Sequence, residues 1–511
     1  MSDSHPLPDV PEKQPSTTVV VVGAGISGLA CAYALQQAGV AVQVLEASSQ
    51  AGGWVQSFAV EEHRYLLEGG PNSFPSSSKA VVALAEQLGV PLVSANENAK
   101  HRFIALGADL LTVPHSLWSA ITTNLLPWRA KLRLLQEPFI APLSADAPEE
   151  TVAQFVERRL GVLAHTRMVQ PFLTGVYAGN SNQLSAKAVF PKLVAYEQDY
   201  GSIIKGLLAS FRKNKSKIKN KRPYALLNCA GGMKTFIQKL EQALAGTVHL
   251  NTPVTGLKQT ASGWELQLGN GQKISADGVV LATPAFVTSQ LVASLSTEAR
   301  LLLDAVEYAP ITVVYQAFKK RHLTNRKEGF GVLRSWEVPN PVNQAWLGSL
   351  WTSSVFPNRC PKDEWLVSHF FGGACHTDVL LWSESRAIEE ATAQSRWLLG
   401  SAPKAMPTLN AVFNHAKAIP QYTLGHTDRM SIAQTLLAYQ APTLQLVGNY
   451  LQGINLNSCV ESGQVACEKL LKMPPFQKAP QAPASVHTTE PLPPISLDDN
   501  VSAIDSTATI H

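Results

Sequence analysis

The chain has 511 residues, of which 45% are hydrophobic, and its formal net charge is +4 at pH 7. This length exceeds what one hydrophobic core holds, so we expect two or three subdomains, and so small a charge indicates no nucleic-acid partner. The six cysteines show neither a Cys-x-x-Cys pair nor metal-ligand spacing, which predicts reduced, mostly buried thiols and no metal site. No apolar run reaches 18 residues, so no membrane-spanning helix is expected.

The two ends of the chain differ in composition from the rest. Residues 1–16 and 473–511 are polar and proline-rich without hydrophobic periodicity, and we expect both to be disordered. The first 15 residues lack an apolar core and carry acidic side chains, which is typical of neither a signal peptide nor an arginine-rich transit peptide.

The first predicted element is a run of four valines at 19–22, which suits a strand buried on both faces of a parallel sheet. Residues 23–28 read Gly-Ala-Gly-Ile-Ser-Gly and open a helix. This spacing allows a tight turn, lets a pyrophosphate approach the backbone and lets the helix pack on the strand. Glu46 ends the next strand, where an acid accepts ribose hydroxyls. The pattern predicts a dinucleotide site, and the glycine pair at 52–53 favours FAD as the carrier.

Helical and strand patterns alternate along the rest of the chain. We expect helices at 80–88, 151–160 and 462–471, and strands at 247–251, 263–268, 278–282 and 444–449. The apolar strands at 278–282 and 444–449 resemble the first one, so the dinucleotide domain is discontinuous. The expected class is α/β (α+β overall). A Rossmann-like FAD-binding domain is formed by 17–100, 225–290 and 410–472, a helical, membrane-contacting domain by 101–224, and a substrate-binding domain by 291–409.

Two segments of the helical part have an open interpretation. Residues 114–139 mix Trp, Leu and Phe with Arg and Lys, as in a helix lying at a membrane interface, or they form a helix packed inside the protein. Residues 212–222 are strongly basic, which indicates either a solvated loop or a patch that attracts anionic lipid headgroups.

Further motifs lie at 68–74, 171–179, 201–204, 230–233, 328–333, 356–361, 419–426 and 448–463. Phe-Pro-x-Arg-x-Pro at 356–361 and Ile-Pro-Gln-Tyr-x-x-Gly-His at 419–426 are the most specific. From residue 19 to residue 471 the chain resembles the oxygen-dependent protoporphyrinogen oxidases of the flavin amine oxidase superfamily.

The resemblance implies a reaction. Protoporphyrinogen IX would lose six electrons in three flavin cycles, each moving a hydride to flavin N5 and reducing O2 to hydrogen peroxide, to give protoporphyrin IX for haem synthesis. It implies no catalytic residue beyond the flavin itself, and the sequence shows no Ser-His-Asp set and no obvious carboxylate pair. A flavin supplies its own electrophile, so the protein need only bind, aim and desolvate.

The resemblance also implies site residues. The cofactor-binding set is Gly23, Ala24, Gly25, Ile26, Ser27, Gly28, Glu46, Ala47, Gly53, Trp54, Gly70, Pro71, Asn72, Ser73, Val254, Ile454, Asn455 and Leu456. The substrate set is Arg102, which pairs with a propionate, Leu333, Leu350 and Phe370, which sandwich the pyrrole rings, and Gly175 and Ala178, whose backbone lines the slot. Trp54 replaces an Arg of many relatives, Thr427 a Trp of some, and Asn180 a usual Asp that has no assigned role.

The implied partners are protoporphyrinogen IX, O2 and a membrane surface, with handover to a ferrochelatase and a homodimer as further expectations. The expected location is a bacterial cytoplasmic membrane face, to which the protein binds peripherally. Two other readings stay open: another flavin oxidase or desaturase acting on coproporphyrinogen, an amine or a polyene, and a non-catalytic flavoprotein scaffold. Arg102 and the apolar slot residues argue against the scaffold, which needs neither.

Overall fold

A computed structural model describes residues 17–114, 119, 122–144, 146–214, 225–402 and 404–477. Residues 1–16, most of the predicted disordered tail 473–511 and most of the basic run 212–222 lie outside this part. The prediction of a disordered tail from 473 is wrong at its start, because Phe476 is only 3% exposed and packs in the core around the helix at 26–37.

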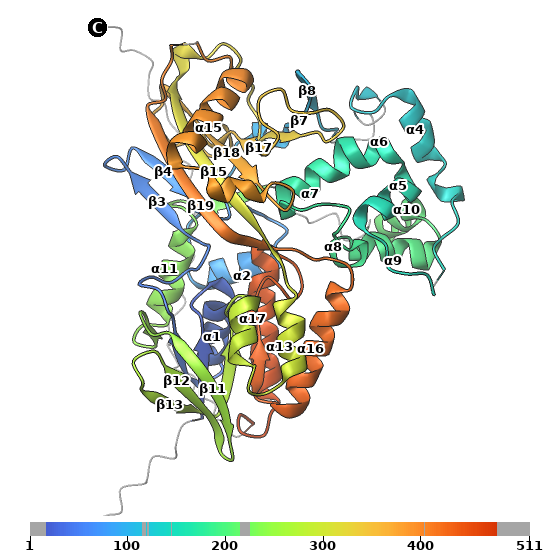
Figure 1. The fold of residues 1–511 in the computed structure, drawn as a ribbon. Helices are drawn as coiled ribbons and strands as arrows, with labels where there is room; N and C mark the ends of the chain where they lie inside the picture. The colour runs from blue at the N-terminus through green and yellow to red at the C-terminus, as the bar shows by residue number, and fades with distance from the viewer. Residues whose placement is uncertain are drawn as a thin grey trace, which may run out of the picture. The chain divides into compact units, whose positions relative to one another are not determined.

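A five-stranded parallel sheet forms the base of the predicted FAD-binding domain (Figure 1). Its strands, in the order β10-β2-β1-β14-β20, are β10 (Val248–His249), β2 (Ala41–Leu45), β1 (Thr18–Val22), β14 (Gly278–Leu281) and β20 (Leu444–Leu446). Val19, Val20 and Val21 of β1 have no exposed surface, as the valine run predicts for a central parallel strand. The strands come from the beginning, middle and end of the chain, so the sheet is discontinuous in sequence.

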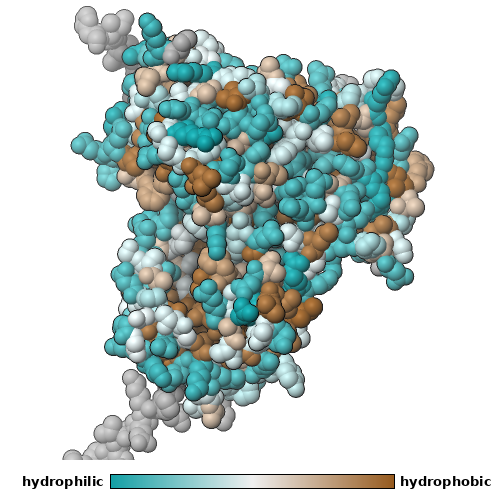
Figure 2. Space-filling view, in the orientation of Figure 1, coloured by the Kyte–Doolittle hydropathy of each residue, from teal (hydrophilic) through white to brown (hydrophobic). Residues whose placement is uncertain are grey.

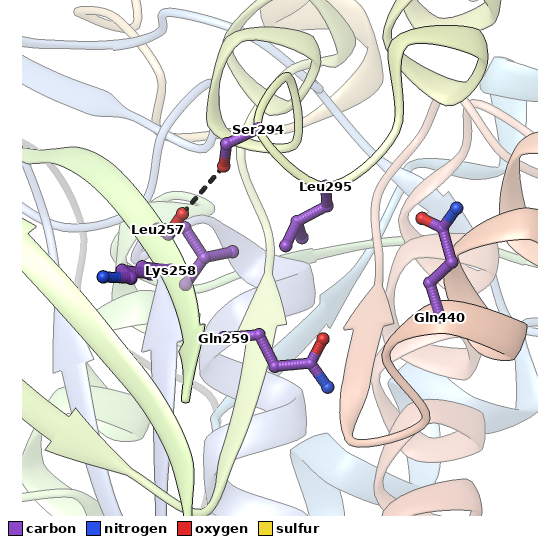
Figure 3. Close-up of a pocket in the computed structure, with 6 residues that line it drawn as sticks. All are labelled: Leu257, Lys258, Gln259, Ser294, Leu295 and Gln440. Atoms are coloured by element: carbon purple, nitrogen blue, oxygen red, sulfur yellow. Dashed lines mark hydrogen bonds between the residues drawn. The ribbon is translucent and has the colours of Figure 1, made fainter. Parts of the chain in front are cut away.

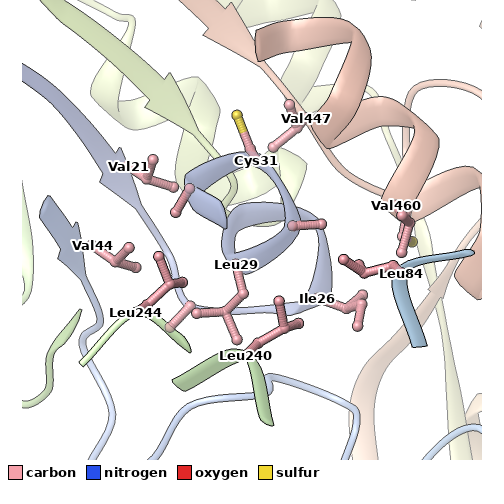
Figure 4. Close-up of a cluster of buried hydrophobic side chains, with 14 of the residues drawn as sticks. Val21, Ile26, Leu29, Cys31, Val44, Leu84, Leu240, Leu244, Val447 and Val460 are labelled. Carbon is pink, nitrogen blue, oxygen red and sulfur yellow. The ribbon is translucent and has the colours of Figure 1, made fainter. Parts of the chain in front are cut away.

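Helices bury one face of this sheet. They are α1 (Ile26–Gln37), α2 (Lys79–Gln87), α11 (Lys234–Ala243) and α17 (Leu456–Leu471). Figure 4 shows Leu29 of α1 among Val21, Val44, Leu240 and Leu244. The predicted start of the last helix at 462 is wrong, because Asn455 caps the helix by accepting a hydrogen bond from the Ser458 backbone N–H at 3.0 Å.

The second large sheet has seven strands. Its order is β19 (Leu409–Pro420), β15 (Tyr308–Lys319), β18 (Glu364–Gly372), β17 (Trp346–Leu350), β16 (Gly331–Arg334), β7 (Arg102–Leu106) and β8 (Asp109–Thr112). All pairs are antiparallel except β16 with β7. The predicted boundary at residue 101 is therefore misplaced, since residues 102–112 pair with the predicted substrate-binding part rather than with the helical part.

The helical part comprises α4 (Trp128–Leu135), α5 (Val152–Leu160), α7 (Gln170–Tyr177), α8 (Ala186–Val189), α9 (Pro191–Tyr200) and α10 (Ile203–Asn214) (Figure 1). The predicted helix at 151–160 is confirmed, and Thr151 and Gln154 form a capping box at its start. Within the segment 114–139, Trp128–Leu135 forms an α-helix that begins after Pro127, and residues 119 and 122 are helical too; residues 115–118, 120 and 121 lie outside the described part.

Smaller sheets and helices complete the fold. They are the antiparallel sheet of β11 (Val254–Thr260), β12 (Gly263–Leu268) and β13 (Lys273–Ala276), the hairpin of β3 (Ser57–Val60) and β4 (Tyr65–Glu68), the sheet of β5 (Phe74–Pro75), β9 (Leu226–Cys229) and β6 (Leu92–Ser94), and helices α12 (Ala285–Leu291), α13 (Thr297–Asp304), α14 (Thr352–Val355), α15 (Glu384–Leu399) and α16 (His426–Gln440). Among the described residues, no helix is both long and apolar enough to cross a bilayer.

Candidate cofactor and substrate site

The glycine loop between β1 and α1 has the geometry of a dinucleotide cradle. A Cβ added to Gly28 would fall 2.1 Å from the Gly23 carbonyl oxygen, so only glycine lets helix and strand approach this closely. Gly25 differs, because its φ of −69° suits any residue and a Cβ there would meet no atom within 4 Å. Nothing within the described chain requires glycine at position 25, and the open space beside it fits a group that comes to lie on the backbone. Ala24, Ile26 and Ser27 belong to the same turn and the first turn of α1, and all three are buried.

Glu46 lies where β2 ends, beside this loop. Its Oε2 accepts a hydrogen bond from the Ala24 N–H at 2.7 Å, and its Oε1 accepts from the Ser48 N–H at 2.9 Å. The Thr252 N–H donates to the Glu46 carbonyl at 2.7 Å, which brings the segment leading to Val254 next to the acid. The structure thus brings Glu46, the predicted ribose residue, and the segment leading to Val254 together with the glycine loop. Ala47 follows Glu46 directly.

A second loop crosses the glycine loop. The Gly52 N–H donates to the Ala24 carbonyl at 2.8 Å, and a Cβ on Gly53 would lie 3.6 Å from the Gly25 Cα. Trp54 follows, with 44% of its surface exposed. We call residues 52–54 the tryptophan loop.

The segment 69–73, here called the flavin loop, packs against the tryptophan loop. A Cβ on Gly70 would lie 1.9 Å from the Trp54 carbonyl oxygen, so the two backbones are in contact. Pro71 and Ser73 flank Asn72, whose carbonyl accepts a hydrogen bond from Asn228 Nδ2 at 2.7 Å. Predicted cofactor residues from two separate loops are therefore adjacent.

A buried carboxylate fixes the strand before the flavin loop. Glu68, 4% exposed, accepts hydrogen bonds from Ser57 Oγ at 2.5 Å and Asn228 Nδ2 at 3.0 Å, and Arg359 lies 3.6 Å away. Burial raises the pKa of Glu68 above its ordinary range, while the hydrogen bonds and the Arg359 charge oppose that shift. Sequence reasoning missed Asn228, because an Asn in a short strand gives no signal of its long-range partners.

The C-terminal segment reaches the same region through α17. Asn455 caps the helix, Leu456 is its first residue, and Ile454 packs against a cluster that contains Tyr422 and Leu173. A Cβ on Gly463 would lie 2.6 Å from the Ser27 carbonyl, so α17 and α1 are in close contact.

The predicted substrate residues share one face of the seven-stranded sheet. The register places Arg102, Gly331 and Leu350 side by side across β7, β16 and β17. Two residues along, Leu333, Gly348 and Phe370 are aligned across β16, β17 and β18. Because side chains alternate along a strand and aligned residues point to the same side, Arg102, Leu333, Leu350 and Phe370 lie on one face.

Helix α7 packs on this face. A Cβ on Gly175 would lie 2.7 Å from Leu333 Cδ2, which explains why a residue without a side chain stands there. Ala178, at the end of α7, is 4% exposed and clusters with Leu347 and Phe370. Ala178 has a left-handed φ of +47°, and its carbonyl accepts a hydrogen bond from the Ala374 N–H at 2.8 Å. All six predicted substrate residues are thus brought together.

Arg102 is the charged member of this set. It is exposed at the start of β7, and its guanidinium carbon lies 5.1 Å from the centre of the Phe330 ring. Phe330 in turn packs with Leu350 and Phe370. An apolar surface with a cation at its edge suits an apolar molecule that carries a carboxylate.

A separate hollow of about 590 Å³ lies beside β11 and is lined by Leu257, Lys258, Gln259, Ser294, Leu295 and Gln440 (Figure 3). Ser294 Oγ donates to the Leu257 carbonyl at 3.0 Å. None of the predicted cofactor or substrate residues lines it. In the described ranges no group of three or more His, Cys, Asp or Glu side chains could hold a metal ion.

Comparison with known proteins decides the family. A family model described as flavin containing amine oxidoreductase matches residues 26–471. The chloroplastic protoporphyrinogen oxidase of Nicotiana tabacum is 32% identical over 467 residues, which cover 88% of this chain and 84% of that protein. The chain belongs to the flavin-containing amine oxidoreductase family, among its protoporphyrinogen oxidases. The predicted resemblance is confirmed, and with it the FAD cofactor, the oxidoreductase class and a role in porphyrin biosynthesis.

Other relatives of this oxidoreductase show how far the likeness extends. The human protoporphyrinogen oxidase is 31% identical over 493 residues, covering 90% of this chain and 99% of that protein. The coproporphyrinogen III oxidase of Bacillus subtilis is 24% identical over 469 residues, with 89% and 97% covered. A solved structure of a candidate protoporphyrinogen oxidase from Exiguobacterium has a TM-score of 0.74 at 23% identity, covering 89% and 98%, and supports the fold.

Proposed function

We propose that this oxidoreductase converts protoporphyrinogen IX to protoporphyrin IX, a six-electron oxidation in which O2 is the final acceptor and hydrogen peroxide is released. The observation that carries the proposal is the sheet face that holds Arg102 with Leu333, Leu350 and Phe370. Leu333, Leu350 and Phe370 are apolar and match the rings of the macrocycle, whereas the guanidinium of Arg102 at the edge matches a propionate.

The predicted cofactor residues fit FAD. Three features support this. The open space at Gly25 supports binding of the pyrophosphate, and the acid at Glu46 supports binding of the ribose. The contact between the tryptophan and flavin loops supports binding of the flavin. Bound in this way, FAD would supply the acceptor for a hydride equivalent and the route by which its electrons reach O2. The protein's own residues bind the macrocycle, orient it and exclude water, and on the α7 side Gly175 packs against Leu333 while Ala178 packs with Phe370.

The main alternative substrate is a coproporphyrinogen, which has four carboxylates where protoporphyrinogen has two. The Bacillus relative named for that substrate supports this second candidate. Among the predicted substrate residues, Arg102 is the only charged one, which favours the substrate with fewer carboxylates.

A direct assay tests the proposal and the alternative together. Purified FAD-loaded protein is mixed with protoporphyrinogen IX or coproporphyrinogen III in air, and porphyrin fluorescence is followed. We expect a higher kcat/KM for protoporphyrinogen, a rise in KM of about tenfold for Arg102→Ala through loss of a charge-assisted bond, and a smaller rise for Arg102→Lys. Faster turnover of coproporphyrinogen would overturn the substrate assignment, and no rate above the air-only control would overturn the function.

We also propose that the protein binds peripherally to a membrane surface through its helical part. Large apolar side chains are exposed there: Trp128 (65%), Leu135 (68%), Phe139 (89%) and Phe211 (65%). Arg129 and Lys131 accompany them on α4. Figure 2 shows hydrophobic groups among hydrophilic ones along the right-hand edge, where α4 lies in Figure 1. Apolar groups next to basic ones are typical of an interfacial helix, and the substrate is itself poorly soluble in water.

A further inference from the structure

A tyrosine of the seven-stranded sheet reaches the flavin loop. Tyr315, on β15, has no exposed surface, and its hydroxyl donates to the Glu68 carbonyl at 2.9 Å and to Asn72 Oδ1 at 3.2 Å. Glu68 directly precedes the flavin loop, and Asn72 lies near the loop's other end. One hydroxyl therefore contacts the chain at both ends of this loop.

Tyr315 stands on the face of the sheet that carries the predicted substrate residues. Val313, two residues earlier on β15, is aligned with Phe370 of β18. Because residues two apart on a strand point to the same side, Tyr315 shares the face of Phe370. The flavin loop is thus tied to the same sheet face on which the macrocycle is proposed to bind.

The surroundings of Tyr315 fix its ring and keep its hydroxyl protonated. The ring lies edge-on to that of Phe413 on β19, with centroids 5.9 Å apart and an interplanar angle of 89°. Burial raises the pKa of the Tyr315 hydroxyl above its ordinary value, so the group keeps its proton and can donate it to an acceptor. The side chain therefore presents a donor at a fixed place.

Hydrogen bonds within and beside the flavin loop pass this contact on to its backbone. Asn72 Nδ2 donates to the Gly70 carbonyl at 3.2 Å, and the Asn72 carbonyl accepts from Asn228 Nδ2 at 2.7 Å. The two adjacent glycines, Gly69 and Gly70, leave the backbone conformationally free in itself. The side chains that hold Asn72 and the residue before the loop therefore restrict which path the loop takes.

We propose that Tyr315 is a positioning residue of this oxidoreductase, whose hydroxyl fixes the flavin loop relative to the sheet face and thereby sets the geometry between flavin and substrate. The inference rests on the proposed function and on the proposed placement of FAD along this loop. Tyr315 acts through Glu68 and Asn72 and need not touch the reacting atoms. Because transfer between two bound groups is sensitive to displacements of about 1 Å, a small shift of the loop would slow the reaction without releasing either group.

The same substitution at two buried tyrosines separates positioning from stability. Tyr315→Phe keeps the ring and removes only the hydroxyl. The matched control is Tyr65→Phe on β4, because Tyr65 is 1% exposed and its hydroxyl donates to the buried Glu364 Oε2 at 2.6 Å. Both variants lose a buried hydroxyl that donates a hydrogen bond, but only Tyr315→Phe loses contacts with Glu68 and Asn72.

The experiment measures FAD binding to the apoprotein, the visible absorption spectrum of the bound flavin, thermal stability, and the rates of flavin reduction by protoporphyrinogen IX without oxygen and of reoxidation by O2. We expect Tyr315→Phe to bind FAD about fivefold more weakly with a shifted flavin spectrum, because two acceptors lose their donor. Its flavin reduction should slow by about tenfold while reoxidation stays within about twofold, since O2 needs no alignment with the sheet face. Tyr65→Phe should lower thermal stability but keep the wild-type FAD affinity, spectrum and reduction rate.

Three outcomes would overturn the inference: wild-type spectrum and reduction rate in Tyr315→Phe, equal losses in Tyr65→Phe, or equal slowing of reduction and reoxidation. If Tyr315→Phe does not fold, Asn72→Ala is measured in its place, and an unchanged spectrum and reduction rate there would overturn the inference equally. Wild-type protein that binds FAD but does not oxidise protoporphyrinogen would reject the proposed function, whereas the FAD affinity and flavin spectrum of Tyr315→Phe would still test the role of the hydroxyl.

Discussion

The glycines of the first loop serve different purposes at the scale of single residues. Gly28 is required by the protein itself, since any Cβ would collide with the Gly23 carbonyl. Gly25 stands in ordinary backbone geometry with free space beside it, so its lack of a side chain serves a bound group. The motif spacing predicted both glycines, but only the structure separates the two reasons.

The different surroundings of Gly25 and Gly28 predict different effects of the same substitution at the two positions. Gly25→Ser should leave the stability of the apoprotein nearly unchanged, because Ser is a good N-cap residue, and should weaken FAD binding by at least tenfold. Gly28→Ser should instead lower the unfolding free energy by about 2 kcal/mol or more through overpacking. Denaturant unfolding of the apoproteins and FAD titration check both. Equal effects of the two substitutions on stability would contradict the assignment.

A buried histidine gives a pH prediction. His369 on β18 has no exposed surface and lies between Ser349 Oγ and Ser395 Oγ, each 2.7 Å from a ring nitrogen. Burial lowers the pKa of His369 from 6.5 to about 3. The unfolded chain therefore binds a proton at a higher pH than the folded one, so this group's stability contribution is present above pH 6.5 and is lost as the pH falls toward 3.

Between pH 6.5 and pH 3, the free energy of unfolding should therefore fall by about 1.4 kcal/mol for each pH unit because of His369 alone. His369→Gln removes the titration, so the stability advantage of wild type over the variant should shrink between pH 7 and pH 5.5. Urea unfolding at the two pH values measures it. A constant difference between wild type and variant would contradict the shifted pKa.

At the scale of elements, strand and helix interiors were easier to predict than their ends. The strand at 263–268 is confirmed without change, because alternating apolar residues fix it locally. The last helix begins six residues before its predicted start, because a polar cap at Asn455 carries no hydrophobic signal. The placement of β7 beside β16 could not be predicted from local pattern, since it joins segments more than 200 residues apart.

The contact between α7 and β16 predicts a substrate effect. In Gly175→Val the new side chain would meet Leu333, which would have to move on the face assigned to the macrocycle. We expect KM for protoporphyrinogen to rise at least tenfold while FAD affinity changes by less than twofold. Steady-state kinetics and FAD titration of the same preparation decide this. A loss of FAD binding in parallel with KM would place Gly175 at the cofactor instead.

At the scale of the whole molecule, the exposed apolar groups of α4 predict association with membranes. Replacing Trp128 and Leu135 with Ser should reduce binding to vesicles that contain anionic phospholipid by at least tenfold, because each side chain loses about 1.5 kcal/mol or more of apolar transfer free energy. Co-sedimentation with vesicles measures the bound fraction.

The control changes two apolar residues elsewhere that are even more exposed than Trp128 and Leu135. Leu381 is 86% and Met406 72% exposed, and their replacement with Ser should leave vesicle binding unchanged. Similar losses in both double variants, or no binding of wild type, would contradict a membrane contact through α4.

The family, the FAD cofactor and the shared location of the predicted site residues could be inferred from sequence because they rest on motifs. The hydrogen bond of 2.9 Å that the Tyr315 hydroxyl donates to the Glu68 carbonyl and the contact of the His415 ring with Trp54 could not, since both residues stand in strands with no distinguishing local pattern. Both contacts depend on the register of the seven-stranded sheet. Its strands come from four separate segments of the chain, 102–112, 308–350, 364–372 and 409–420.

The proposed oxidation of protoporphyrinogen IX by bound FAD is tested most directly by mixing the FAD-loaded protein with this substrate without oxygen and then admitting air. We expect loss of the oxidised flavin's visible absorption at a rate that exceeds turnover, its return with O2, and three molecules of hydrogen peroxide for each protoporphyrin IX formed. Porphyrin formation with the flavin remaining oxidised, or a flavin that stays oxidised with no porphyrin formed, would contradict it.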